Sequence, residues 1–458
     1  MNAIVLAAGE GTKIWPYNET RQKCTLPVGN VPLVRRLVED LLVLNLRRIA
    51  VVVGAHAPSV RHALHGLEAP LLFVEQRERK GTAPAALLAL AELGEEEEFL
   101  VVYGDLALGQ ENLQAVVEAF RADQPVAAAL VHPLGEERSL DWLCAKVTAG
   151  QLTAVEGHPR GGSHRLGGVY AFHPAAVPYL RNNPGLFRHV PVGGMPPLEA
   201  EIAQSVAMLL EEGQMVRAVE TTEFFVDVDK PWHILEANAR LLDYLCARLE
   251  GNQIAPDARI HDGAEIEGRV VLGPGSSIGN RVVVRGDLFV GAHAQLTNGA
   301  ILGGEVLVGD HCRVRDYGLV GSHSVLGPHS LVAHGAEFSG VLFDGVFLYH
   351  YCEMAGVYGS RVDIGAASVC GTLRFDDENT LHYIKGRREF PRWGANCAYM
   401  GDYSRTGVNA ILMPGVKVGA YSCVGPGVVL YEDLPSRKVV LLQQELVFKD
   451  WGPEKYGW

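Results

Sequence analysis

The feature that most constrains this chain is a six-residue repeat in its second half. From Ile254 to Phe338 an aliphatic or aromatic residue recurs at every sixth position without interruption. The positions that share this property are Ile254, Ile260, Ile266, Leu272, Ile278, Val284, Val290, Leu296, Leu302, Val308, Val314, Val320, Leu326, Val332 and Phe338. An aliphatic residue at any one position is roughly a one-in-four event, so chance does not produce such a run. A hexapeptide repeat is the signature of a parallel β-helix, in which the repeated residue points inward and stacks coil on coil.

Glycine usage fits the same architecture. The chain has 52 glycines, and many repeat positions are followed by one, as in Leu272–Gly273 and Val308–Gly309. Glycine serves the tight or left-handed turns between short strands. The register breaks at Asp344 and resumes at Met400, and the segment Leu373–Arg392 between them is charged and irregular. We expect this segment to loop out of the solenoid.

The first half has a different pattern, in which short β-rich runs alternate with amphipathic helical runs. The expected strands are Ala3–Leu6, Ile49–Val53, Leu71–Val74, Phe99–Tyr103 and Val126–Val131. The expected helices include Pro32–Leu44, Gly81–Leu93 and Asn112–Phe120. Strand–helix alternation predicts a parallel sheet covered on both faces. Ligands on such sheets bind at the carboxyl ends of the strands.

These patterns divide the chain into four parts. We expect an α/β Rossmann-like domain over 1–230, a connecting helix over 231–251, a β-helix over 252–434 and a tail over 435–458. The tail contains the apolar stretch VVLLQQELVF, which we expect to pack across a subunit contact.

Composition excludes several classes. The net charge is −13 with no basic block, so a nucleic-acid coat is not expected. The eight cysteines stand singly without CxxC spacing, which indicates buried thiols in a reducing compartment. No run of ~18 apolar residues is present, so we expect no membrane span. The apolar opening Met1–Ala8 runs straight into a glycine-rich loop and is interpreted as a strand, so we expect a cytoplasmic protein.

Four motifs in the first half carry chemistry. The first strand runs into AAGEGTKIWP, where Gly9 and Gly11 let backbone amides approach a phosphate, Thr12 adds a hydroxyl and Lys13 a charge. The other three motifs are RQKCTLPVGNVPLV with Lys23, EQRERKGTAPAALLAL with Gln76, Gly81 and Thr82, and VVYGDLAL with Gly104 and Asp105.

In order and spacing these motifs resemble the sugar-1-phosphate nucleotidyltransferases. The resemblance implies nucleotide contacts from Leu6, Ala8, Gly9, Gly11, Thr12, Lys13, Gln76, Gly81 and Thr82, with Gln76 and the Gly81–Thr82 turn reading a pyrimidine. It implies phosphate contacts from Lys23 and sugar contacts from Gly104, Glu156 and Gly168. It also implies a Mg²⁺ ion on Asp105, with a second ligand in FFVDVDKPWHIL: Asp227 matches the family pattern better and Asp229 is the second choice.

The chain departs from the family pattern at several points. Lys13 replaces an arginine, which keeps the charge but loses the planar fork that grips phosphate. Gln22 replaces a proline, Leu166 replaces a sugar-binding asparagine, and the lysine that follows Glu156 in the family is missing. The triphosphate half of the site therefore matches better than the sugar half, and the sequence does not choose the nucleotide or the sugar.

The second half resembles left-handed β-helix acyltransferases. More narrowly, residues 371–434 are similar to the archaeal type of bifunctional N-acetylglucosamine-1-phosphate uridylyltransferase / glucosamine-1-phosphate acetyltransferase. The resemblance implies that His350 is the base that deprotonates a sugar amine before it attacks acetyl-CoA. Glu353, Thr372 and Glu378 replace a family tyrosine, asparagine and lysine, so we expect acetyl transfer to be lost.

Three functions remain open. The leading one is Mg²⁺-dependent transfer of a nucleotidyl group from UTP or dTTP to a sugar 1-phosphate, with release of pyrophosphate. The alternatives are a bifunctional enzyme that also acetylates glucosamine 1-phosphate with acetyl-CoA, and a non-catalytic relative that binds a nucleotide or sugar and acts as a regulatory or scaffolding subunit. The related β-helix proteins form trimers, so we expect a homotrimer.

Overall fold

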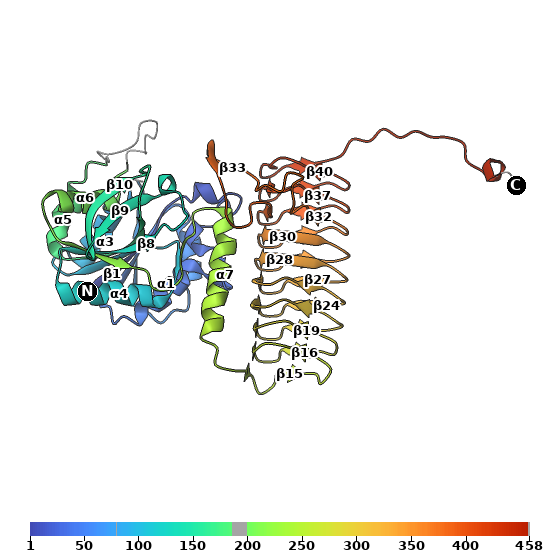
Figure 1. Ribbon diagram of the computed structural model, residues 1–458, viewed down its shortest axis with the longest axis horizontal. Coiled ribbons are helices and arrows are strands. Elements are labelled where there is room, and N and C mark those ends of the chain that lie inside the picture. Colours follow the sequence, from blue (N-terminus) through green and yellow to red (C-terminus); the bar gives the residue numbers. More distant parts are fainter. Residues whose placement is uncertain (79, 186–198, 457–458) are drawn as a thin grey trace.

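The computed structural model describes residues 1–78, 80–185 and 199–456. An α/β domain and a tall stack of short strands lie side by side, with helix α7 (Pro231–Ala247) between them (Figure 1). This arrangement places α7 where the sequence predicts a connecting helix. The C-terminal tail leaves the stack at the end opposite to its first coil (Figure 1).

The first domain is built on one nine-stranded sheet, with strand order β5-β4-β1-β6-β11-β8-β12-β10-β9. Its strands are β1 (Asn2–Ala7), β4 (Ile49–Val53), β5 (Leu71–Glu75), β6 (Phe99–Tyr103), β8 (Ala127–Pro133), β9 (Leu143–Thr148), β10 (Gln151–Gly157), β11 (His164–Phe172) and β12 (Val216–Glu220). The prediction of a parallel sheet holds for β5, β4, β1 and β6. Beyond them, β8 and β12 also pair in parallel, but β11 lies between β6 and β8 and runs antiparallel to both, and β9 and β10 form an antiparallel pair at the edge of the sheet. The sheet is therefore mixed instead of wholly parallel.

Helices cover both faces of this sheet. They are α1 (Leu33–Leu42), α2 (Ala57–Ala63), α3 (Thr82–Leu93), α4 (Gln110–Asp123), α5 (Val177–Arg181) and α6 (Ile202–Glu211). One apolar cluster joins α3, α5 and α6 to the sheet, and a second cluster joins α1, α2 and α4 to its other face. Two short pairs, β2 (Pro27–Val28) with β3 (Val31–Pro32) and β7 (Leu106–Leu108) with β13 (Phe225–Asp227), lie outside the main sheet.

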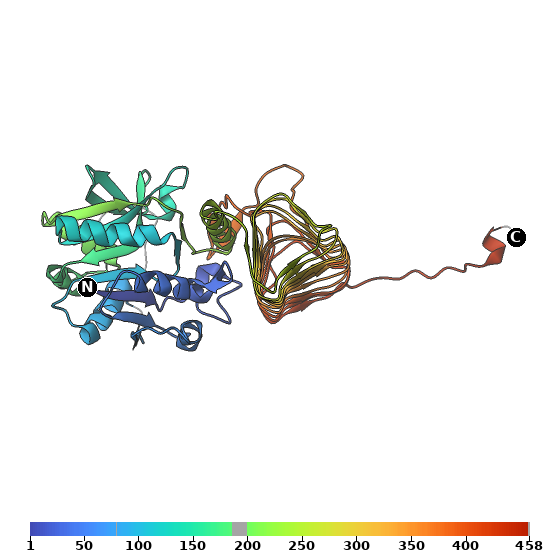
Figure 2. The ribbon, with the colours of Figure 1, turned by 90° about the horizontal axis from the view of Figure 1, so that it is seen from below.

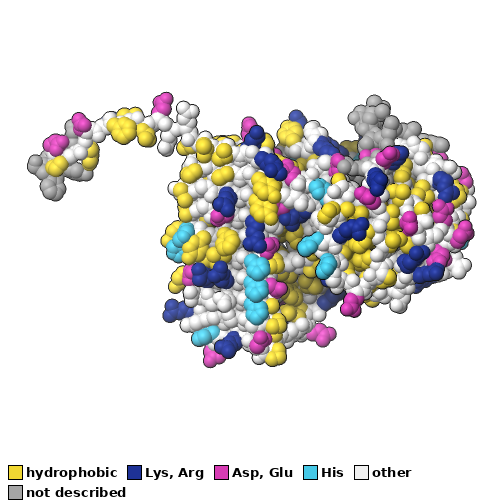
Figure 3. Space-filling view, turned by 180° about the vertical axis from the view of Figure 1, so that it is seen from behind, with side chains coloured by type: hydrophobic (Ala, Val, Ile, Leu, Met, Phe, Trp, Pro, Cys, Tyr) yellow, Lys and Arg dark blue, Asp and Glu magenta, His cyan; other side chains and the backbone are white. Residues whose placement is uncertain are grey.

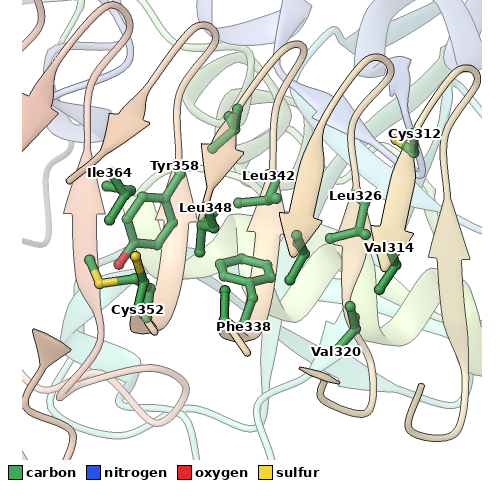
Figure 4. Packing of buried hydrophobic residues seen from close by; sticks show 14 of the residues in the cluster. Cys312, Val314, Val320, Leu326, Phe338, Leu342, Leu348, Cys352, Tyr358 and Ile364 are labelled. Carbon is green, nitrogen blue, oxygen red and sulfur yellow. The ribbon is translucent and has the colours of Figure 1, made fainter. Parts of the chain in front are cut away.

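The second domain is a parallel β-helix of the left-handed hexapeptide type. Each coil takes 18 residues, three hexads, so that β17 (Val270–Leu272) pairs in register with β20 (Leu288–Val290), and β20 with β23 (Val306–Val308). Seen along its axis, the stack has a triangular outline (Figure 2). The repeat residues fill the interior, and Val314, Val320 and Leu326 are fully buried there (Figure 4).

The short strands of this domain form two sheets. The smaller sheet holds β15 (Arg259–Ile260), β18 (Ser277–Ile278), β21 (Gln295–Leu296), β24 (Arg313–Arg315), β27 (Leu331–Ala333), β29 (Phe347–Leu348), β31 (Asp363–Ile364), β36 (Arg405–Thr406), β39 (Cys423–Val424) and β41 (Val439–Val440). Besides β17, β20 and β23, the larger sheet holds β14 (Gln253–Ile254), β16 (Glu265–Ile266), β19 (Val283–Val284), β22 (Ile301–Leu302), β25 (Leu319–Val320), β26 (Val325–Leu326), β28 (Glu337–Leu342), β30 (Glu353–Tyr358), β32 (Val369–Cys370), β35 (Ala398–Met400), β37 (Ile411–Leu412), β38 (Lys417–Val418) and β40 (Val429–Leu430). The first coil is open to solvent, because the side chains of Ile254 and Ile260 are 47% and 36% exposed.

The predicted break in the repeat is real, but it begins earlier than Asp344. Phe338 and Leu342 both point into the core, so their spacing is four residues instead of six, and the same shortening recurs in β30. The two coils that contain β28 and β30 each lack one of the three turns of a regular coil. In each of them one longer strand takes the place of two short strands and the turn between them. Gly340 permits this, because its φ is +129° and an added Cβ would strike the carbonyl oxygen of Gly356. The six-residue spacing returns earlier than expected, first over Leu342, Leu348 and Met354 and then over Tyr358, Ile364 and Cys370, and it continues from Met400 after the excursion.

The first domain packs on this flattened edge. Val341, Phe343 and Val357 of the β-helix form one apolar cluster with Tyr17 of the first domain and with Trp232 of α7. The Tyr17 hydroxyl is fully buried and donates to the carbonyl oxygen of Val357 at 2.7 Å. The first domain therefore packs against the β-helix where β28 and β30 replace the missing turn.

The excursion Leu373–Arg392 is more ordered than expected. It contains a hairpin of β33 (His382–Ile384) and β34 (Arg387–Glu389), which lies beside α7 and reaches the first domain (Figure 1). By contrast, the tail beyond Val440 extends away from the fold with Leu446, Val447 and Phe448 exposed, so this single chain shows no surface on which it packs. Of the helices in the described residues, none is both long and apolar enough to cross a membrane.

Candidate functional site

A glycine-rich loop follows β1 and leads to the charged centre of the first domain. Gly11 has φ +61°, and a Cβ there would lie 2.7 Å from Cβ of Lys23. The side chain of Gln22 donates to the carbonyl oxygen of Gly9. The residue that replaces the family proline therefore holds the glycine-rich loop through a hydrogen bond. At Gly9 an added Cβ would meet no atom within 4 Å, so the loop presents open backbone at that point.

Two lysines and three aspartates gather at the carboxyl ends of the neighbouring strands. Asp105 follows β6, and β7 pairs antiparallel with β13, which places Asp227 opposite Leu106. The ammonium group of Lys23 contacts the Asp105 carboxylate and lies 3.3 Å from Oδ1 of Asp229. Nζ of Lys13 lies 3.0 Å from Oδ2 of Asp229. The structure thus joins Lys13, Lys23, Asp105 and Asp229 in one cluster.

Burial and neighbouring charges shift the pKa values of Asp227, Asp229 and Lys23 in this cluster. Burial raises the pKa of Asp227 to about 6, and the negative charge of Asp105 adds to the rise. Burial alone would also raise the pKa of Asp229, but Lys23 and Lys13 outweigh it and hold that pKa far below its usual range. Burial disfavours the charged form of Lys23, yet Asp105 and Asp229 raise its pKa well above the usual value. Lys23 is therefore a permanent cation in this site.

The donor set fits a magnesium ion that arrives with a nucleotide. In the described part of the chain, no group of three or more His, Cys, Asp or Glu side chains is placed to hold a metal by itself. Mg²⁺ commonly uses only one or two carboxylates together with substrate phosphates and water. The ammonium group of Lys23 already contacts the Asp105 carboxylate. This contact shows that the carboxylate attracts a cation at this position.

The residues expected to bind a base lie at the start of α3. Nε2 of Gln76 donates to the carbonyl oxygen of Gly81 at 3.3 Å. Gly81 has φ +107°, and an added Cβ would lie 2.5 Å from the backbone nitrogen of Ala200. The Thr82 hydroxyl donates to Glu201 at 2.7 Å and accepts from the amide of Ile202 at 2.8 Å. Gln76, Gly81 and Thr82 thus lie together at the start of α3, held by hydrogen bonds to one another and to the segment from Glu201 to Ile202.

The expected sugar residues are more dispersed. Gly104 and Gly168 both lie close to Tyr103 or its strand neighbours: Gly168 has φ +68°, and its Cβ would lie 2.9 Å from the Tyr103 ring. Glu156 on β10 pairs with Lys146 on β9 at 2.7 Å. Lys146 is thus the cation beside Glu156, although the strand register places Lys146 opposite Ala154 and Glu156 opposite Cys144. Leu166 packs at the edge of an apolar cluster.

In the β-helix, His350 occupies an exposed turn with φ +58°. Its Nδ1 lies 2.6 Å from Nδ1 of His334, so one ring donates a hydrogen bond to the other. Glu353 begins β30 just after this turn, while Thr372 and Glu378 lie exposed on the excursion. Other histidines stack along an outer corner, with ring centroids of His311 and His329 5.0 Å apart, and Figure 3 shows histidines in a column on this side.

Sequence reasoning missed two charged residues beside the first site. Lys230 follows Asp229 directly, and Glu389 comes from the hairpin of the β-helix domain. The motif DVDKPW contains Lys230, so a signal for it existed. No local pattern could point to Glu389, because it reaches the site only through the packing of the two domains.

Comparison with known proteins agrees with this geometry. Residues 3–180 match the family model described as the MobA-like NTP transferase domain. Together the fold, the loop and the strand-end charges define a sugar-1-phosphate nucleotidyltransferase with a C-terminal parallel β region.

Relatives of this chain match both halves. It is 26% identical to the bifunctional protein GlmU of Methanococcus vannielii, over 98% of this chain and 99% of the relative. It is 24% identical to a bifunctional sugar-1-phosphate nucleotidylyltransferase/acetyltransferase of Sulfurisphaera tokodaii, over 95% of this chain and 98% of the relative. The chain is thus homologous over nearly its full length to archaeal bifunctional proteins, and the expectation that acetyl transfer is lost receives no support from them. A UDP-glucose pyrophosphorylase of Acinetobacter baumannii is similar to part of the structure, with 16% identity and a TM-score of 0.46 over 54% of this chain and 94% of that one.

Proposed function

We propose that the first domain transfers a uridylyl or thymidylyl group from UTP or dTTP to a sugar 1-phosphate. The observation that carries this proposal is the cluster of Lys13, Lys23, Asp105 and Asp229 beneath an open glycine-rich loop. In the reaction, an oxygen of the sugar phosphate attacks the α-phosphorus of the nucleotide, and the bond to the β-phosphate oxygen breaks, with pyrophosphate leaving. Positioning and charge neutralisation supply most of the rate in such transfers.

The two lysines are assigned to the phosphates. Both substrates are polyanions, so the site must hold cations that do not lose their protons. The raised pKa of Lys23 meets this need, and Asp229 orients both ammonium groups because each of its oxygens accepts one of them. Lys13 lies on the loop itself, 53% exposed, and is free to turn from Asp229 toward a phosphate.

Asp105 and Asp227 are assigned to the metal. Burial, and then the negative charge of Asp105, raise the pKa of Asp227, so a bound cation would stabilise the charged form of Asp227. Asp229 is committed to the two lysines, which leaves Asp227 as the better second ligand. Bound Mg²⁺ would neutralise phosphate charge during transfer.

Gln76, Gly81 and Thr82 are assigned to the pyrimidine, and Gly104, Glu156 and Gly168 to the sugar. The hydrogen bonds around Gly81 and Thr82 support a base site because they tie the start of α3 to Gln76 and to Ile202. Glu156 is partly exposed and held by one lysine, which supports a role as an acceptor for sugar hydroxyls.

We further propose a second activity in the β-helix, in which an amino-sugar phosphate is acetylated by acetyl-CoA. Full-length similarity to a protein named as an acetyltransferase favours it, and so does the paired imidazole of His350. The amine nitrogen would attack the thioester carbonyl, its proton would pass to His350, and the CoA thiolate would leave. The proposal includes a homotrimer in the cytoplasm, the assembly and location expected for such enzymes.

The test measures both reactions in the full-length chain. Pyrophosphate release would be followed with Mg²⁺ and each of UTP, dTTP, CTP and GTP against glucose-, N-acetylglucosamine-, galactose- and mannose-1-phosphate. CoA release would be followed with acetyl-CoA and glucosamine 1-phosphate. Asp105→Asn should abolish the first reaction and spare the second, and His350→Ala should do the reverse. Silence of the wild-type chain in the whole nucleotide grid would contradict nucleotidyl transfer, and silence in the second assay would contradict acetyl transfer.

A further inference from the structure

The hairpin β33–β34 ties the β-helix domain to the rim of the nucleotidyl-transfer site. Arg387 forms an ion pair with Asp141 and donates to the carbonyl oxygen of Leu140 at 3.1 Å. Arg392 pairs with Glu136 in the same loop of the first domain. These contacts are exposed, so each contributes little energy by itself. They nevertheless fix where the end of β34 lies.

At that end, Glu389 meets Lys230 in a buried ion pair. Oε2 of Glu389 lies 3.4 Å from Nζ of Lys230, and the two side chains are only 9% and 8% exposed. The same Nζ lies 4.0 Å from Oδ2 of Asp229. The ammonium of Lys230 thus stands between a carboxylate of the second domain and the carboxylate that orients Lys13 and Lys23.

This position makes the charge of Glu389 matter to the site. A buried ammonium without a partner is costly, so Lys230 must keep a carboxylate. If Glu389 lost its charge, the nearest remaining carboxylate would be Asp229, whose Oδ2 already holds Lys13 at 3.0 Å. Lys230 would then compete with Lys13 for that oxygen, and the site would also gain one net positive charge.

We propose that Glu389 is a positioning residue for nucleotidyl transfer, which acts across the domain boundary by holding Lys230 away from Asp229. The inference rests on the proposed function of this site. It means that the β-helix domain contributes a charge to the reaction of the first domain, besides any reaction of its own.

The test compares full-length Glu389→Gln with wild type in two measurements. The first is kcat for pyrophosphate release with Mg²⁺, UTP and the active sugar 1-phosphate, which should fall about 10-fold because Asp229 no longer orients Lys13. The second is the Kd for UTP in EDTA by calorimetry, which should tighten about 3-fold because the site has gained positive charge. If Glu389 served folding alone, Glu389→Gln would lower both kcat and the affinity for UTP. A lower kcat together with a higher affinity for UTP therefore identifies a charge effect.

Three further variants separate a charge effect of Glu389 from a general loss of structure. Glu136→Gln removes an exposed ion pair of the same hairpin with the first domain and should change neither quantity by more than about 2-fold. Glu389→Asp keeps the charge and should restore most of kcat even if Glu389→Gln folds poorly. In a Lys230→Met background, Glu389→Gln should have almost no further effect on kcat, because the two residues act as one unit.

The outcomes separate the two proposals. A wild-type chain that releases no pyrophosphate overturns the proposed function, and this inference with it. An active wild type with unchanged Glu389→Gln, with parallel weakening of kcat and UTP binding, or with the same loss in the Lys230→Met background overturns this inference alone.

Discussion

Arg21 of the first domain and Asp402 of the β-helix form an ion pair in the interface between the two domains. Nη2 of Arg21 lies 2.5 Å from Oδ2 of Asp402, whose side chain is fully buried. Oδ1 of Asp402 accepts the backbone amide of Ser360 at 2.7 Å, and the hydroxyl of Thr20 also contacts the carboxylate. Arg21 stands two residues before Lys23, so the β-helix anchors the segment that carries the cation of the reaction site.

Removing this anchor should weaken the whole molecule. Asp402→Ala leaves Arg21 without its partner, and the loss should be about 3–4 kcal/mol in the free energy of unfolding, as for other buried pairs broken on one side. Urea denaturation followed by tryptophan fluorescence measures it. Asp344→Ala is the matched control, because Asp344 pairs with Arg361 in an exposed turn of the same domain and should lose less than about 1 kcal/mol. Equal losses in the two variants would show that burial of the pair is not the cause.

Tyr17 provides a second, uncharged link. Tyr17→Phe keeps the ring against Phe343, whose centroid lies 5.4 Å away, but removes the hydroxyl that donates to the carbonyl oxygen of Val357. We expect a loss of about 1 kcal/mol in the free energy of unfolding, typical of one buried hydrogen bond. Tyr383→Phe, at an exposed position of the hairpin, should be neutral in the same experiment.

Lys13 tests how the phosphate loop uses its charge. Lys13→Gln should lower kcat/KM for pyrophosphate release about 100-fold, because one charge-assisted phosphate contact is lost. Lys13→Arg should retain activity within about 3-fold, because the charge remains and the fork can bind phosphate with two donors. Steady-state kinetics at saturating Mg²⁺ decides between these outcomes, and equal loss in both variants would place Lys13 outside the phosphate site.

The pKa of Asp227 predicts a pH dependence of metal binding. Its value of about 6 in the folded chain lies above the ordinary 3.8, so the metal-free folded state takes up a proton below about pH 6. This contribution to stability is complete below about pH 4 and is lost as the pH rises through 6. Because the proton must leave when Mg²⁺ binds, the apparent Mg²⁺ affinity should fall about tenfold for each pH unit below 6.

Titration calorimetry with MgCl₂ and UTP between pH 5 and 8 measures this dependence. Asp227→Asn should bind Mg²⁺ more weakly and lose the steep fall below pH 6. Glu136→Gln, which alters an exposed carboxylate, should keep the wild-type profile. A wild-type affinity that does not change between pH 5 and 6 would contradict the assignment of Asp227 to the metal.

The tail and the outer face of the β-helix bear on the expected trimer. Stacked Tyr403 and Tyr421 lie exposed on the solenoid, and Phe448 and Trp451 are 88% and 73% exposed on the tail. Aromatic side chains exposed in this way are typical of an interface between subunits. Light scattering should therefore give a mass of three chains, and removal of residues 441–458 should shift the equilibrium toward smaller species. A monomeric full-length chain would contradict the trimer.

Most of the secondary structure could be predicted because it follows from local periodicity. The strands Ile49–Val53 and Phe99–Tyr103 have the predicted bounds, and the hexapeptide positions line the solenoid core. The direction of β11 could not be predicted, because a strand reads the same whether its neighbours run parallel or antiparallel. The hairpin β33–β34 was also beyond reach, since its charged residues resemble those of a solvated loop.

The sequence by itself determined the two architectures and marked the glycine-rich loop, Lys13, Lys23 and Asp105 as candidate site residues, because each of these features depends on residues close together in the chain. Only the tertiary structure decided which aspartate orients the lysines, that the first domain packs where the turn near Gly340 is missing, and that Arg21 and Lys230 meet carboxylates of the β-helix. Those relationships join residues far apart in sequence. Each of these ion pairs forms only when packing brings its two side chains together and removes them from water.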